Sequence, residues 1–260
     1  MSEVEPRCHS ELFVSWRLTD AQRAQFEKDG YLIVGKTLTV AGLETLRSEC
    51  MAAWNTSKEG FHPDRTWLQN SLLANVHHHS EVARRFYFEG PLVDIAEQLI
   101  GPNIKAATSQ LTFKLRGNTM EFGWHQDNGY GELEPYNAIS TLTALDDADE
   151  ENGCLRYIRG SHKKGLRPHT RTQTLGFSQG ITDFGQPDDL ENEVAFTAGP
   201  GDLLVHHAVT VHRADDNPSE TRDRPAIGFV YLSERAKEDR EEVEAYRKKL
   251  AEDLASQGKI

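Results

Sequence analysis

Cysteine is scarce in this chain, and what little there is does not form a pattern. Cys8, Cys50 and Cys154 are the only three in 260 residues. An odd, widely spaced set argues against a disulfide framework, and no two of the cysteines have the close spacing of a zinc knuckle. The sequence therefore predicts free thiols in a reducing compartment, and we expect a cytoplasmic protein.

Long apolar runs and an excess of basic charge are also missing. No stretch approaches the roughly 20 apolar residues that span a bilayer, and residues 1–13 lack the basic start and apolar run of a secretory signal. The net charge is −12, with 29 basic and 41 acidic residues. Nucleic-acid-binding proteins usually present a basic face, because phosphate contacts supply much of their affinity. We therefore expect no membrane or nucleic-acid partner, and the choice between monomer and homo-oligomer stays open.

The part of the chain from about 18 to 100 carries helix signals. Thr19 and Gln22 have capping-box spacing at the start of a helix that Gly30 is suited to end. After a short strand over 31–34, apolar periodicity predicts further helices over about 40–54 and 80–99.

From about 104 to 232 the chain changes to short apolar or alternating runs separated by Gly, Pro, Asn and Asp. The clearest are TSQLTFKLRG, NAISTLTALDD, GCLRYIRG, NEVAFTAGPGDLLVHH and RPAIGFVYLS. Many short strands without helical crossovers predict an antiparallel barrel or double-sheet roll, against which the helices would pack. A charged helix over about 233–257 would follow, with a thin apolar stripe. We expect one domain spanning 1–260, mainly β with flanking helices.

The residues with the clearest chemistry are His125, Asp127 and His212. On a strand, residues i and i+2 point to the same face, so His125 and Asp127 would project together. His212 would end an apolar strand that begins after a GPGD turn. His206 has the same strand parity as His212 and is the second candidate for this ligand. Two histidines and one carboxylate form the facial triad of non-haem Fe(II) oxygenases.

A cation downstream of His212 fits the same chemistry. Three protein ligands leave three neighbouring positions on the metal, of which a 2-oxo acid would take two and O₂ the third. The far carboxylate of 2-oxoglutarate then needs a cation, and Arg can bind it with two hydrogen bonds. Arg222 and Arg224 share one parity; Arg224 directly precedes the PAIGFVYL strand and is preferred, with Arg222 second.

Other polar residues are open to two interpretations. Gln110, Thr112 and Lys114 alternate with apolar residues and predict either an active-site lining or a half-exposed sheet face. Thr141 and Thr143 would line the pocket or fill a strand. The run 77–79, three histidines, is interpreted as a polar loop near the substrate entrance, because adjacent residues cannot all face one ion. Trp67 and Trp124 would shape the pocket or the core.

Several motifs together resemble a known family. They are WHQD, then ALDD, ENG and GSH within 138–165, then GDLLVHHAVTVHRADDN and a later RPA. Over about 20–232 the chain resembles the phytanoyl-CoA dioxygenase family of Fe(II)/2-oxoglutarate-dependent oxygenases. The resemblance implies a double-stranded β-helix (jelly-roll, cupin-like) core, Fe(II) held by His125, Asp127 and His212, and 2-oxoglutarate anchored by the Arg before Pro225. It also favours Gln110 and Lys114, with Thr143, as cofactor or substrate contacts.

The expected function is a 2-oxoglutarate-dependent non-haem iron dioxygenase that hydroxylates an unactivated C–H bond of a small molecule and releases succinate and CO₂. Its cofactors would be Fe(II), 2-oxoglutarate and O₂, with ascorbate in support. Related halogenases lack the carboxylate ligand, so Asp127 argues against halogenation. The alternatives are a cupin-like metal enzyme that does not use 2-oxoglutarate and a non-catalytic binding barrel. Substrate identity would depend on loops over about 55–80, 115–124 and 165–192, the last a candidate lid.

Overall fold

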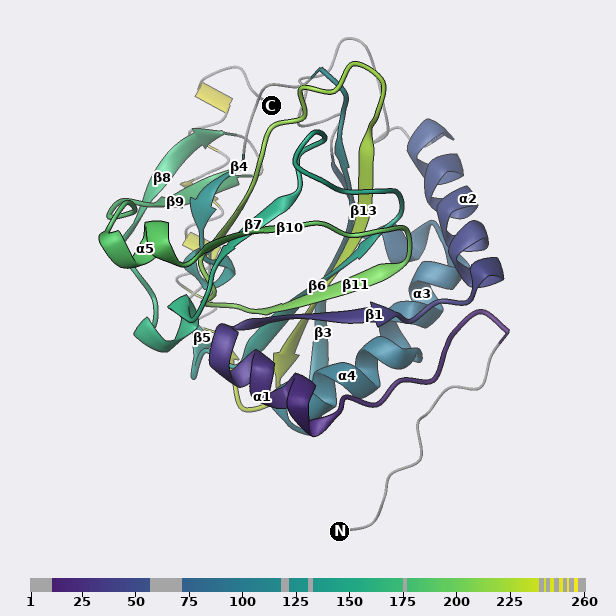
Figure 1. The fold of residues 1–260 in the computed structure, drawn as a ribbon, viewed down its shortest axis with the longest axis horizontal. Coiled ribbons are helices and arrows are strands. Elements are labelled where there is room, and N and C mark those ends of the chain that lie inside the picture. Colours follow the sequence, from purple (N-terminus) through teal and green to yellow (C-terminus); the bar gives the residue numbers. More distant parts are fainter. Residues whose placement is uncertain are drawn as a thin grey trace.

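The computed structural model describes residues 11–56, 72–117, 122–130, 133–174 and 177–238, with single positions between 241 and 256. Its centre is formed by two antiparallel sheets, one of six strands and one of four, with helices on the outside of the larger sheet (Figure 1). Apolar side chains from both sheets line a common interior. The expected jelly-roll core with flanking helices is therefore confirmed.

The larger sheet has antiparallel neighbours throughout. Its strands, in spatial order, are β1 (Tyr31–Lys36), β11 (Asp202–His207), β6 (Ala138–Ala144), β13 (Arg224–Ser233), β3 (Ile104–Lys114) and β2 (Leu72–Ala74). The smaller sheet contains β10 (Glu193–Phe196), β7 (Leu155–Ile158), β12 (His212–Ala214) and β4 (Phe122–His125). Neighbours in space are distant in sequence, so the sheets bring distant motifs together.

Helices cover the outer face of the larger sheet. They are α1 (Asp20–Asp29), α2 (Val40–Thr56), α3 (Glu81–Phe88) and α4 (Pro91–Ile100). The side chain of Thr19 caps α1 and Gly30 ends it in the left-handed conformation, as predicted. The single helix expected over 80–99 is two helices, because Pro91 has no N–H for a helical hydrogen bond and disfavours a helical Gly90. None of the helices in the described part of the chain combines the length and apolar character that a bilayer crossing requires.

Short elements complete the described chain. They are η1 (Val76–His78), η2 (Asp127–Tyr130), η3 (Ser161–Lys164), α5 (Pro187–Glu191), the β8 (His169–Thr174) and β9 (Phe177–Ile181) hairpin, and the β5 (Leu133–Glu134) and β14 (Lys237–Glu238) pair. The helix expected from residue 233 starts later. β13 continues to Ser233, and β14 pairs with β5, so backbone pairing takes precedence over local helix propensity there. The described positions from 241 to 256 are helical, and the predicted apolar stripe lies outside the described residues.

Gly153, in the turn before β7, occupies a position that only glycine fits. Its φ is +85°, and an added Cβ would lie 2.7 Å from the Asp216 carbonyl oxygen and 2.8 Å from that of Asp215. We expect Gly153→Ala to lower the free energy of unfolding by about 1–3 kcal/mol or more, because strain and a backbone clash add. The control is Gly117→Ala, where φ is +71° but no atom lies within 4 Å. Equal losses for both variants in urea denaturation would contradict the role of the clash.

Candidate metal centre

The structure brings His125, Asp127 and His212 together, each from a different element. His125 ends β4, Asp127 opens η2, and His212 begins β12, where it pairs directly with His125. One ligand atom from each residue lies within 4.8 Å of the others. Asp127 Oδ1 is 3.7 Å from His125 Nε2 and 3.6 Å from His212 Nε2. The three predicted ligands therefore converge on one point.

Two details of the backbone differ from the sequence prediction. His125 and Asp127 do not share a strand, because β4 ends at His125 and the carboxylate follows in a 3₁₀ turn. The apolar strand expected to end at His212 instead ends at His207, and the chain then crosses to the smaller sheet before β12. Strand parity consequently says nothing about the relation between His206 and His212.

Backbone carbonyls orient both histidine rings. His125 Nδ1 lies 3.0 Å from the Gly123 carbonyl oxygen, and His212 Nδ1 lies 2.9 Å from that of Thr210. A carbonyl can only accept, so each Nδ1 carries the proton and each Nε2 presents its lone pair. Burial lowers the pKa of His125 to about 4 and also moves the pKa of His212 well below its ordinary value. Both rings are thus neutral at physiological pH, as metal binding requires.

Asp127 is the ionised partner of these rings. Burial by itself would raise the pKa of Asp127, but the neighbouring His212 and the hydrogen bond from His206 outweigh it, so the pKa lies below its ordinary value. Two imidazole nitrogens and one carboxylate oxygen suit Fe(II), and three ligands on one side leave the opposite side open. The residues present therefore fit the implied iron ion.

His206, the second candidate for a ligand, has a different place. Its Nε2 lies 3.0 Å from Asp127 Oδ2, the oxygen that does not face the other two histidines. Its Nδ1 lies 3.0 Å from the Tyr157 hydroxyl oxygen. Ser140, opposite His206 on β6, also donates a hydrogen bond to Asp127 Oδ2. No sequence pattern singles out Ser140 or Tyr157, because their roles depend on strand register.

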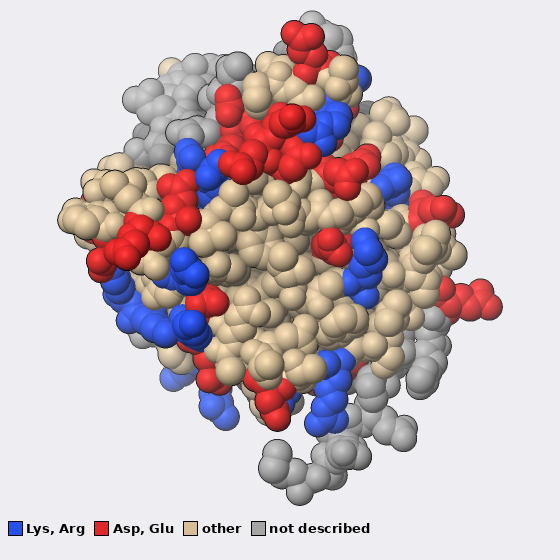
Figure 2. All heavy atoms as spheres, in the orientation of Figure 1, with Lys and Arg blue, Asp and Glu red and all other residues tan. Residues whose placement is uncertain are grey.

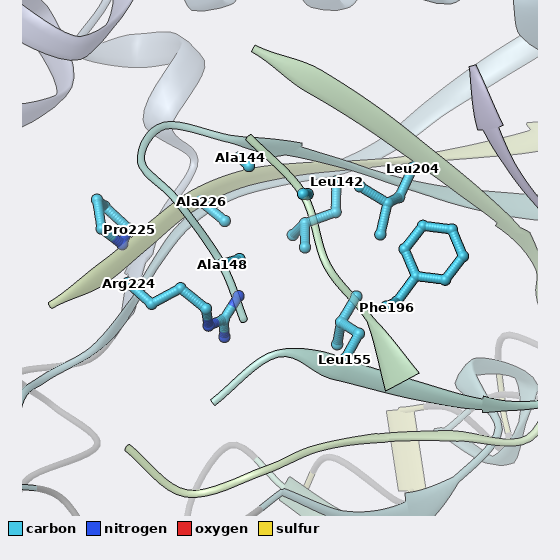
Figure 3. Close-up of a pocket in the computed structure, with 10 residues that line it drawn as sticks. Leu142, Ala144, Ala148, Leu155, Phe196, Leu204, Arg224, Pro225 and Ala226 are labelled. Atoms are coloured by element: carbon cyan, nitrogen blue, oxygen red, sulfur yellow. The ribbon is translucent and has the colours of Figure 1, made fainter. Parts of the chain in front are cut away.

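Arg224 lies in the interior between the sheets (Figure 3). Its side chain is 4% exposed and lines a cavity with apolar neighbours, among them Leu142, Leu155, Phe196, Leu204 and Ala226. Its Nε has no hydrogen-bond partner, and in the described part of the chain no carboxylate forms an ion pair with it. Burial lowers the pKa of Arg224 to about 10, so the group stays cationic at neutral pH. A buried cation in this setting favours an anionic ligand.

Arg222, the other candidate anchor, is already paired at the surface. Its guanidinium lies 2.7 and 2.8 Å from the carboxylate oxygens of Asp149 and 3.0 Å from that of Glu151. The hydrogen bonds to Asp149 raise the pKa of Arg222. Arg222 therefore has carboxylate partners within the protein, whereas the guanidinium of Arg224 faces the cavity.

Strand register separates the remaining candidates. Lys114 is the register partner of Arg224 and Gln110 that of Gly228, so both lie on the inner face. Lys114 is 1% exposed, with Nζ 4.2 Å from the centre of the Phe122 ring, and Gln110 is exposed. Thr143 is placed on the other face: it pairs with Leu203 and Ile227, whose side chains pack under the helices. The structure does not bring Thr143 to the centre, because adjacent strand residues face opposite sides.

The described part of segment 165–192 has more regular structure than the long loop that the sequence suggested. It contains the β8–β9 hairpin and α5. The Arg167 guanidinium, 2.7 Å from Asp189 and 2.9 Å from Asp183, ties its two ends together. The side chain of Gln126, between two ligands, accepts from Arg167 N–H at 2.8 Å and donates to Val209 O at 2.6 Å. The segment is therefore joined to the metal centre.

The tryptophans and the histidine run that the sequence singled out do not join the metal ligands in the described structure. Trp124 stacks on Phe184, with ring centroids 4.3 Å apart. His77 Nδ1 lies 2.5 Å from Ser109 Oγ, and the run 77–79 is not part of a metal-binding group among the described residues. Trp67, most of loop 55–80 and part of loop 115–124 lie outside the described residues.

Comparisons with known proteins agree with this geometry. The family Phytanoyl-CoA dioxygenase (PhyH) matches residues 26–226. "Phytanoyl-CoA dioxygenase 1" of Oryza sativa subsp. japonica is 30% identical over 58% of this chain and 53% of its own length. "L-proline trans-4-hydroxylase" of Streptomyces griseoviridis is 24% identical over 80% of this chain and 84% of its own. The chain thus spans about half the length of the rice relative.

A solved structure shows the same fold. EvdO2 from Micromonospora carbonacea var. aurantiaca, complexed with 2-oxoglutarate, superposes with a TM-score of 0.70 at 20% identity, covering 88% of this chain and 96% of that one. At this identity the likeness concerns the fold alone. The family match covers most of the chain, including all three converging ligands and Arg224. This chain belongs to the phytanoyl-CoA dioxygenase family.

Proposed function

We propose that this protein is an Fe(II)- and 2-oxoglutarate-dependent dioxygenase that hydroxylates an unactivated C–H bond of a small-molecule substrate. The proposal rests on one observation: three metal ligands and a buried arginine lie in the interior between the two sheets. His125, Asp127 and His212 converge as a facial set of metal ligands. Arg224, a buried cation with no carboxylate partner among the described residues, lines the cavity between the sheets.

Each residue has a part in this activity. His125 and His212 present Nε2 lone pairs, and Asp127 presents Oδ1, to hold iron with one face open. Arg224 binds the far carboxylate of 2-oxoglutarate, with Lys114 on the same face of the sheet. Bound iron supplies the O₂ chemistry that converts 2-oxoglutarate to succinate and CO₂ as substrate is hydroxylated. The apolar cavity walls exclude water from the cosubstrate.

The cavity favours this function over the two alternatives. A cupin-like enzyme without 2-oxoglutarate does not need a buried guanidinium, which is costly without an anion. A non-catalytic barrel does not require that guanidinium and three metal ligands together. Relatives named L-proline trans-4-hydroxylase and ectoine dioxygenase support a small-molecule substrate. The basic side chains visible in Figure 2 are dispersed among acidic ones, which does not favour a nucleic-acid partner. We further propose a single domain and a cytoplasmic location, with Cys50 and Cys154 as free thiols.

The test is succinate formation from 2-oxoglutarate in air with Fe(II) and ascorbate, before any substrate is known. Many oxygenases of this kind convert 2-oxoglutarate slowly without substrate, so we expect succinate that depends on iron and O₂. Binding of 2-oxoglutarate to the iron-loaded protein without O₂ is measured in parallel by equilibrium dialysis. If neither succinate formation nor 2-oxoglutarate binding is detected, the proposal is wrong, and the cupin-like enzyme and the non-catalytic barrel become the better interpretations. Binding without any turnover favours the non-catalytic barrel.

A further inference from the structure

The carboxylate of Asp127 has two oxygens with different surroundings. Oδ1 lies 3.7 Å from His125 Nε2 and 3.6 Å from His212 Nε2, so it faces the point where the ligands converge. Oδ2 accepts hydrogen bonds from His206 Nε2, at 3.0 Å, and from the Ser140 hydroxyl. A carboxylate whose second oxygen is already used by protein donors binds a metal through the first oxygen only.

His206 is itself held on its other side. Its Nδ1 lies 3.0 Å from the Tyr157 hydroxyl, which can donate to it. With Nδ1 as acceptor, Nε2 carries a proton and donates it to the Asp127 carboxylate. Tyr157 is fully buried and stacks on Tyr31, with ring centroids 4.8 Å apart, and it forms a T-shaped pair with Phe196. The hydroxyl therefore cannot move far from His206.

This chain of contacts joins the two sheets at the metal centre. His206 lies on β11 and Ser140 on β6, in the larger sheet, and they are register partners. Tyr157 lies on β7 of the smaller sheet, as the register partner of His212. Asp127 follows β4 in a short 3₁₀ turn. A turn by itself leaves the carboxylate free to rotate, so donors from the larger sheet are what limit its orientation.

We infer that His206, held by Tyr157, is a positioning residue that keeps Asp127 a one-oxygen ligand and so preserves the open face of the metal. The inference rests on the proposed iron site and goes beyond it by assigning a role to two residues outside the ligand set. Loss of a residue that hydrogen-bonds to a metal ligand typically reduces metal affinity about 10- to 100-fold. Without His206, the Ser140 hydroxyl is the one remaining donor to Oδ2 among the described contacts, so Asp127 could more easily rotate away or bind through both oxygens.

The test uses the complete apo-protein and Co(II) alone as the probe. His206→Phe removes the donor and keeps a ring; His206→Gln keeps an N–H donor near the Nε2 position; Tyr157→Phe removes one oxygen atom. We expect His206→Phe to weaken Co(II) binding about 10- to 100-fold and to change the visible Co(II) spectrum, which reports ligand number and geometry. His206→Gln should restore most of both, and Tyr157→Phe should show a smaller change of the same kind.

The matched control is His207→Phe, which removes the neighbouring imidazole. In the described structure His207 accepts from the Val209 N–H at 3.3 Å and makes no hydrogen bond to a metal ligand. Melting of each apo-protein separates lost folding from lost positioning. If His206→Phe does not fold, Tyr157→Phe and His206→Gln decide. Unchanged affinity and spectrum in Tyr157→Phe would overturn the inference. So would a folded His206→Gln protein that binds Co(II) no better than His206→Phe, or a His207→Phe protein that loses as much affinity as His206→Phe.

Failure of the iron site itself gives a different result. If the wild-type protein does not bind one Co(II) ion, or if His212→Ala binds it equally well, the proposed metal site is wrong and the positioning role falls with it. If the wild type binds Co(II) and His212→Ala does not, while His206→Phe matches the wild type in affinity and spectrum, the metal site stands and the positioning role alone is rejected.

Discussion

Replacing His212 with alanine is expected to weaken Co(II) or Fe(II) binding by more than about 100-fold and to abolish succinate formation. Loss of a ligand's hydrogen-bonding partner alone costs about 10- to 100-fold, so loss of the ligand itself should cost more. His212 supplies one of three donor atoms that lie within 4.8 Å of one another. Its Nδ1–H donates to the Thr210 carbonyl at 2.9 Å, so Nε2 is the donor atom offered to the metal, and alanine removes it.

The control for this prediction is His79→Ala, which removes an exposed histidine outside the triad. Its metal affinity and succinate formation should match those of the wild type. Metal affinity is measured by titration of the apo-protein, and folding by circular dichroism. The prediction would be contradicted by a folded His212→Ala protein that retains wild-type metal affinity, and that result would move the ligand role to another histidine, with His206 the first candidate.

Replacing Arg224 with methionine is expected to raise the Kd for 2-oxoglutarate by about 30-fold to a few thousand-fold. Removing one partner of a buried, hydrogen-bonded charge pair costs about 2–5 kcal/mol, and each 1.4 kcal/mol is about tenfold in affinity. Arg224 is 4% exposed, and its neighbours in the cavity are apolar. Methionine keeps much of the side-chain volume, so the cavity should keep its shape while losing the charge and the hydrogen-bond donors.

The stability of the same variant should change in a direction that distinguishes a ligand anchor from a structural arginine. In the protein without 2-oxoglutarate, Arg224 is a buried cation with no carboxylate partner among the described residues. The free energy of unfolding of Arg224→Met without ligand should therefore stay unchanged or rise. With 2-oxoglutarate at 100 times the Kd, the wild type should gain about 2.7 kcal/mol, and the variant should gain little at the same concentration.

Arg222→Met is the matched control. It removes an arginine two residues away that is paired with Asp149 and Glu151 at the surface. Its effect on 2-oxoglutarate affinity should be small, and its effect on stability should be that of an exposed ion pair, about 0–1 kcal/mol. A larger loss of 2-oxoglutarate affinity in Arg222→Met than in Arg224→Met would reverse the assignment of the anchor.

Much of the fold follows from local features of the chain. The capping box of Thr19 and Gln22 and the left-handed Gly30 predict both ends of α1, since a helix must satisfy its terminal N–H and carbonyl groups locally. Apolar runs bounded by turn residues predict most of the strands. Boundaries were predicted less well. Pro91 divides one expected helix into two, and pairing with β5 makes Lys237–Glu238 a strand in a segment with a helical pattern.

The sequence by itself determined the residue types of the centre: two histidines, one carboxylate and a following arginine, because each carries its chemistry in its own side chain. Only the tertiary structure decided which side chains share a space. It placed Thr143 under the helices, paired Arg222 with Asp149, and left Arg224 facing the cavity. It also brought His206, Ser140 and Tyr157 to Asp127. Those relations depend on the register and crossing of strands up to about a hundred residues apart, which no local pattern encodes.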